Sequence, residues 1–200
     1  MPFIEVINRF QFEFYQINGT KYYKNVNPCS FEVKEQLEKC AGEMFLSGIP
    51  EHITADQIAN VACLLGEMYI LRFKVNFAGL SRGFAYLQYM NPSLMDYALQ
   101  SLPYLFMEYK LGNIHVQPSK NNSNLVLRYT TGMTTEEVHN TLAEMCNFQE
   151  CNVRYFRGNR MEFQLVFGSN EDAVRARRNL LGQVHMFGEL ATIGWDIYKN

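Results

Sequence analysis

The stretch Arg82-Gly83-Phe84-Ala85-Tyr86-Leu87-Gln88-Tyr89 decides the fold of this chain. Successive side chains of a β-strand point to opposite faces of its sheet, so Leu87 is expected on the buried face. Arg82, Phe84 and Tyr86 then lie together on the other face. The stretch therefore predicts a strand that presents two rings and a guanidinium on one side.

The segments on both sides of this strand predict the order β-α-β-β-α-β. Apolar residues recur at i, i+3, i+4 and i+7 where helices are expected and alternate with polar residues where strands are expected. The first copy of this order has strands at 44–47, 68–75, 83–89 and 113–117, and its helices begin at Thr54 and after Asn91-Pro92-Ser93.

The same order recurs after a short polar stretch. The second copy has strands at 125–129, 152–156, 161–167 and 192–196, and helices from Thr134 or Thr135 and over 171–181. A repeat of this kind predicts the α+β class, with two ferredoxin-like βαββαβ domains in tandem. The expected boundaries are an extended aromatic N-terminal arm at 1–41 that packs on the first domain, a first domain at 42–118, a linker at 119–124 and a second domain at 125–200.

The outward residues of the first copy carry the chemistry. The quoted stretch meets the signature K/R-G-F/Y-G/A-F-V-x-F/Y that marks the RNA-recognition motif, or RRM, with Tyr86 and Leu87 as conservative departures. The partner segment of this motif, Met44 to Ile49, contains the adjacent strand and adds Phe45 to the same face. Bases of single-stranded RNA stack on such rings, so Phe45, Phe84 and Tyr86 are candidate stacking residues and Arg82 a candidate phosphate contact.

Three further cations are weaker candidates. Arg72 and Lys74 are expected on the solvent side of the strand beside the rings, and Lys120 lies in the linker. Phosphate contact and ordinary solvation remain equal alternatives for each of them.

The second copy lacks the stacking rings. Glu162 and Gln164 stand where the first copy has aromatic residues, Val126 replaces the ring of Phe45, and Met161 replaces the glycine. A carboxylate on this face would repel phosphate. The second domain is expected to brace the first, bind a protein partner, or contact RNA through its arginines, namely Arg154, Arg157, Arg160, Arg175, Arg177 and Arg178.

Further motifs resemble one group of tandem RRM proteins, which contains hnRNP R and Q, the apobec complementation factor and dead end. Gln16 to Tyr23 is similar to the N-G-Q-R-K-Y segment that precedes the first RRM of that group. Ala176 to Leu180, Val184 to Gly188 and Trp195 resemble the group's A-R-R-K-L, I-Q-L-W-G and terminal tryptophan.

The resemblance implies an mRNA regulator. Such a protein binds U- or A-rich single-stranded 3′ untranslated sequence and controls translation or decay, often in germ cells. The resemblance also implies that the protein is located in the cytoplasm, with the nucleus as a second compartment. The chain departs from the group at Glu162 and Gln164, which puts RNA clamping by both domains in doubt.

Composition leaves a second function open. Lys plus Arg number 18 against 20 Asp plus Glu, a formal charge of −2, and no basic tail is present. This weak charge favours a protein-interaction scaffold as the alternative, with the second domain or the N-terminal arm as the docking surface.

Other classes have little support in the sequence. The five cysteines show no zinc-ligand spacing and are expected to be reduced thiols, with no metal or cofactor. No leader, membrane span or catalytic motif is recognisable, so an enzyme is not expected.

Overall fold

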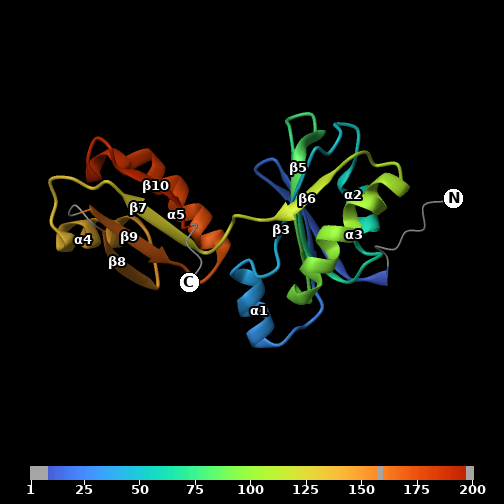
Figure 1. Cartoon of the computed structure of the whole chain (residues 1–200), viewed down its shortest axis with the longest axis horizontal. Coiled ribbons are helices and arrows are strands. Elements are labelled where there is room, and N and C mark those ends of the chain that lie inside the picture. The colour runs from blue at the N-terminus through green and yellow to red at the C-terminus, as the bar shows by residue number, and fades with distance from the viewer. Residues whose placement is uncertain (1–8, 157–159, 197–200) are drawn as a thin grey trace. The chain divides into compact units, whose positions relative to one another are not determined.

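The computed structural model describes residues 9–156 and 160–196, and for Arg160 the backbone alone. The chain divides into two compact units, each with its own sheet and core. The first contains Met1–Leu37 and Ala41–Ser119, and the second contains Glu38–Cys40 and Lys120–Asn200 (Figure 1). Phe3 of the expected aromatic arm lies outside the described residues.

The first unit contains the βαββαβ order that the sequence predicts. Its elements are β3 (Met44–Ser47), α2 (Ala55–Ala62), β4 (Met68–Val75), β5 (Ser81–Tyr89), α3 (Met95–Glu108) and β6 (His115–Pro118), with a 3-10 turn, η2 (Pro92–Leu94), before α3. All strand pairs are antiparallel. The helices α2 and α3 pack together beside this sheet (Figure 1), and their apolar faces close the core.

Helix α2 begins where its capping residues require. Thr54 accepts a hydrogen bond from the Gln57 backbone N–H, and the Gln57 side chain accepts one from the Thr54 N–H. This reciprocal box satisfies two backbone donors that would otherwise lack partners. The apolar residues that follow are buried against the sheet, so the cap fixes which face of α2 meets the core.

The structure differs from the expected extended arm at the N-terminus. β1 (Phe12–Ile17) and β2 (Thr20–Asn25) form a hairpin, followed by α1 (Phe31–Glu38). Asn18 and Gly19 make the turn with φ of 48° and 68°, the left-handed values of a two-residue hairpin turn. β2 pairs with β4, so the sheet has six strands in the order β1-β2-β4-β5-β3-β6.

Side chains hold this hairpin on the first unit. The Tyr23 hydroxyl donates to Asp56 Oδ1 at 2.8 Å, and burial of the phenol together with that carboxylate raises the pKa of Tyr23. Asn25 Nδ2 donates to Glu67 Oε1 and to the Met68 carbonyl, both at 2.8 Å. The hairpin is therefore part of the folded unit.

The second unit repeats the order without an added hairpin. Its elements are β7 (Asn124–Arg128), α4 (Thr135–Met145), β8 (Glu150–Phe156), β9 (Arg160–Val166), α5 (Asn170–Gln183), a 3-10 turn, η3 (Val184–Phe187), and β10 (Thr192–Trp195). The sheet order is β10-β7-β9-β8, and Thr134 caps α4 through a box with Glu137. Both units thus have the α+β fold expected of tandem RRMs.

No helix within the described ranges has the length and apolar character needed to cross a membrane.

Candidate nucleic-acid interface

Three rings form one cluster on the face of the first sheet that α2 and α3 leave uncovered. Phe45 on β3 lies opposite Tyr86 on β5, and the next outward pair is Ser47 with Phe84. The ring centroid of Phe45 lies 5.2 Å from that of Tyr86 and 5.9 Å from that of Phe84. We call Phe45, Phe84 and Tyr86 the ring cluster.

Strand alternation explains why the ring cluster faces away from the core. Met44, Leu46, Ala85 and Leu87 point to the opposite side and are buried there. The three rings are half-buried, so solvent reaches them although they shield one another. They are the stacking residues that the sequence predicts, and their contact with RNA stays a prediction.

Arg82 lies at the end of the ring cluster. Its side chain is exposed, and its guanidinium carbon is 5.4 Å from the Phe84 centroid. A guanidinium over a ring gains cation–π attraction and keeps its donors available to an anion. Arg82 can therefore bind a phosphate that joins two stacked bases.

The other predicted cations have different surroundings. Arg72 carries an ion pair with Glu43, and its guanidinium lies 5.2 Å from the Tyr86 centroid. Lys74 donates to Thr20 Oγ1 at 2.8 Å. Lys120 is exposed and belongs to the second unit, so the structure does not place it with the ring cluster. The phosphate roles of all three remain untested.

The hairpin adds two tyrosines that the sequence analysis did not select. Tyr15 and Tyr22 stack on each other, with centroids 4.7 Å apart and an interplanar angle of 12°. The register joins both to the ring cluster in one row across six strands, which consists of Tyr15, Tyr22, Arg72, Tyr86, Phe45 and Gln117. Asn18-Gly19, a hairpin-turn dipeptide between alternating aromatic residues, is the sequence signal that could have predicted this extension.

One end of this face is closed by the chain itself. Gln88, two residues beyond Tyr86 on β5, is buried and donates to the carbonyls of Leu37 and Ala41 at 2.9 and 3.1 Å. The chain at the end of α1 therefore lies over Gln88.

The corresponding face of the second unit carries paired charges. Arg128, Glu162 and Arg154 stand opposite one another on β7, β9 and β8. Glu162 Oε1 lies 3.3 Å from Arg128 Nε, and Arg154 binds Asp196 through two hydrogen bonds of 3.2 and 2.8 Å. The Glu162 carboxylate, which the sequence predicts to repel phosphate, is thus paired inside the unit.

The side chains at the centre of this second face are buried. Val126, Glu162 and Gln164 are each at most 6% exposed, and Gln164 Nε2 donates to Asp196 Oδ2 at 2.6 Å. No ring cluster stands at these positions. Of the candidate arginines, Arg154 pairs with Asp196 and Arg175 with Asp172, while Arg157 lies outside the described residues.

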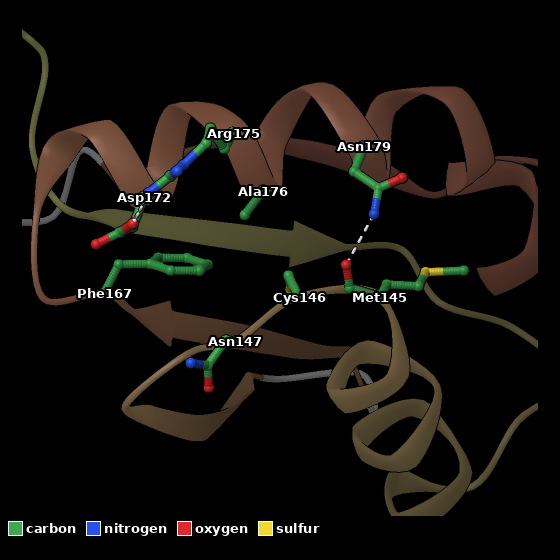
Figure 2. A pocket seen from close by; sticks show the side chains of 8 residues that line it. All are labelled: Met145, Cys146, Asn147, Phe167, Asp172, Arg175, Ala176 and Asn179. Carbon is green, nitrogen blue, oxygen red and sulfur yellow. Dashed lines mark hydrogen bonds and ion pairs between the residues drawn. The ribbon is translucent and has the colours of Figure 1, made fainter.

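A cavity of about 370 Å³ opens on the helical side of the second unit (Figure 2). It lies between α5 and the chain that follows α4, where Asn179 Nδ2 donates to the Met145 carbonyl at 2.7 Å. Cys146 lines it, and burial raises the pKa of this thiol to about 11, with Cys151 adding to the shift. A protonated thiol is a poor nucleophile, so the cavity offers no activated group.

Comparison with known proteins points to one family. A family model described as the protein tumorous testis C-terminal domain matches residues 125–196. The Drosophila melanogaster protein tumorous testis is 33% identical over 188 residues, which cover 92% of this chain and 81% of the relative. Dead end protein homolog 1 of Xenopus laevis is 31% identical over 90 residues, 45% of this chain and 24% of the relative.

Solved structures with tandem RRMs also match. The Sex-lethal protein/RNA complex gives a TM-score of 0.37 at 12% identity and covers 78% of this chain and 99% of that one. The first two RRMs of yeast Pub1 give 0.36 at 15% identity, with coverage of 76% and 98%. The resemblance of the sequence to the group of tandem RRM proteins that contains dead end is confirmed.

Proposed function

The chain belongs to the tumorous testis family, and from this premise we propose that its first unit binds single-stranded RNA by stacking nucleobases. The observation that carries the proposal is the ring cluster, with three rings half-exposed on the one face that no helix of the RRM core covers. Rings left open to water are costly unless a flat partner covers them, and a base does so at roughly 1–3 kcal/mol each.

The cations on this face suit a ligand with few phosphate contacts. Arg82 is exposed beside Phe84, whereas Arg72 is paired with Glu43. Phosphate contacts give affinity without sequence information, and stacking accounts for more of the binding where cations are few. We therefore expect modest affinity and weak dependence on salt.

The row through Tyr22 and Tyr15 extends the proposed face beyond the RRM core. These tyrosines would contact a base farther along the strand than the ring cluster can reach. A longer footprint would raise affinity for long single strands more than for short ones.

The biological setting follows the names of the relatives. One relative is named tumorous testis and the other dead end, and these two names support a role for this chain in germ-cell differentiation. Binding of U- or A-rich 3′ untranslated sequence, followed by translational repression or decay in the cytoplasm, is the form of regulation that we propose. A nuclear pool is also part of the proposal.

The direct test removes two rings. Replacing Phe84 and Tyr86 by alanine should weaken binding of U-rich and A-rich RNA at least about tenfold, since each ring supplies stacking of about 1 kcal/mol or more. Fluorescence anisotropy with the full chain measures the loss. The matched control replaces Tyr155 and Phe156, exposed aromatic residues on β8, and should leave affinity unchanged. Equal affinity of the two double variants would refute the assignment.

A scaffold is the second candidate, and the closed charge network of the second unit favours it. A face whose arginines pair internally is poorly suited to RNA, which leaves this unit free for a protein partner. A pull-down of the full chain after nuclease treatment separates the two functions. A partner of the scaffold stays bound when RNA is destroyed, and an association bridged by RNA is lost.

A further inference from the structure

A buried carboxylate lies beside the ring cluster. Glu43 immediately precedes β3, and its side chain is 1% exposed. Met44 points into the core, so strand alternation places Glu43 on the same face as Phe45. Its Oε2 pairs with Nη2 of Arg72, the residue that lies opposite Tyr86.

This ion pair is not explained by stability alone. The second oxygen, Oε1, is buried without a hydrogen-bond donor among the residues that the structure describes. A buried charge loses its hydration, and the attraction of one partner often does no more than offset that loss. Two uncharged side chains of similar size in place of the pair would cost the fold less. We therefore look for the role of Glu43 in its effect on Arg72.

Glu43 holds the Arg72 side chain in position and neutralises its positive charge. The guanidinium is 16% exposed and lies over the Tyr86 ring at 5.2 Å. A phosphate would have to compete with a carboxylate already in contact with it. The result is an arginine that supports the ring without acting as a net positive charge toward the ligand.

We propose that Glu43 is a positioning residue that withholds Arg72 from phosphate, so that the face selects RNA by base stacking instead of backbone charge. This inference rests on the proposed function and deepens it. Because phosphate contacts are independent of sequence, withholding one lowers non-specific binding more than specific binding. The withheld contact lowers the affinity of the chain for RNA in general and increases its preference for specific over non-specific RNA.

The test is a salt titration of the full chain with oligouridylate. In E43Q the amide still accepts from Arg72 but no longer neutralises it, so the arginine can turn to phosphate. The slope of the logarithm of the RNA-binding constant against the logarithm of the salt concentration should steepen by about 0.7, the value for one added phosphate contact to a single strand. Affinity at low salt should rise several-fold. E43Q/R72Q lacks both charges and should return to the wild-type slope.

Two further measurements separate the outcomes. NMR of the wild-type chain can measure how freely the Arg72 guanidinium rotates. This rotation should be restricted, and it should stay restricted when RNA binds. E43Q should melt near the wild-type temperature. An unchanged slope in E43Q, or a lower melting temperature with no change of slope, overturns the inference while the proposed function stands. If F84A/Y86A also binds as well as the wild type, the proposed function itself fails.

Discussion

Two positions on one strand distinguish the outer sheet faces of the two units. Phe84 and Tyr86 stand on β5 at the positions that Glu162 and Gln164, respectively, occupy on the equivalent strand β9. Alternation alone predicts that all four point away from the core, and it predicted the ring cluster residue by residue. The burial of Glu162 was not predictable, because its cover comes from residues distant in sequence, such as Arg128.

Asp196 is the centre of the paired charges in the second unit. It accepts from Arg154 and from Gln164, which lie 42 and 32 positions away in the sequence. Asp196→Ala would leave a guanidinium and an amide without their acceptor. We expect a loss of about 2–4 kcal/mol in the free energy of unfolding, less than for a fully buried pair because Arg154 is 22% exposed.

The chain offers a built-in probe for this prediction. Trp195 is the one tryptophan of the sequence and belongs to the second unit, so its fluorescence during urea unfolding reports on that unit. RNA affinity of the variant should match the wild type at temperatures where both are folded. An unchanged urea midpoint would show that the network does not stabilise the unit.

The thiols give a prediction that depends on pH. Burial is the main cause that raises the pKa of Cys63 to about 12 and of Cys146 to about 11. A raised pKa means less thiolate, so both should react slowly with iodoacetamide at about pH 8 and faster as the pH approaches those values. Mass spectrometry of the labelled chain measures this, with the urea-unfolded chain as the control. Rapid labelling of both in the folded chain at about pH 8 would contradict the burial.

At the scale of elements, the sequence predicted the strands and helices of both RRM folds to within a few residues. The reason is that their signals are local, such as the Thr54 and Thr134 caps and the alternation along β4 and β5. The hairpin of β1 and β2 was missed because a dense aromatic segment suits packing as an extended arm equally well. Its pairing with β4 is a contact across about 50 residues that no local pattern encodes.

The hairpin supplies its own prediction. Tyr15 and Tyr22 share the row that leads to the ring cluster, so replacing both by alanine should weaken binding of a long oligouridylate about three- to tenfold. A short oligonucleotide that covers only the ring cluster should lose little. Anisotropy with both lengths gives the comparison.

Phe14 is the matched control for that experiment. It lies on the opposite face of the hairpin, is 59% exposed, and packs edge-on against Tyr23. Phe14→Ala should not change RNA affinity at either length. If it weakens binding as much as the tyrosine pair does, the hairpin acts through its folding and not through its outer face.

For the whole molecule, the two units have similar folds and unlike surfaces. The formal charge of −2 gives no general attraction to nucleic acid, so recognition has to come from a local site. We propose that the ring cluster of the first unit is this site, because the charges on the corresponding face of the second unit are paired. The two proposed functions, RNA binding by the first unit and partner binding by the second, do not exclude each other.

The most direct measurement is an NMR map of the isotope-labelled full chain during titration with oligouridylate. The account predicts that shift changes concentrate on β3, β5 and the hairpin strand β2, around Phe45, Phe84, Tyr86 and Tyr22, while β7 and β9 stay unchanged. Shift changes centred on the sheet of the second unit, with the signals of the ring cluster unmoved, would contradict it.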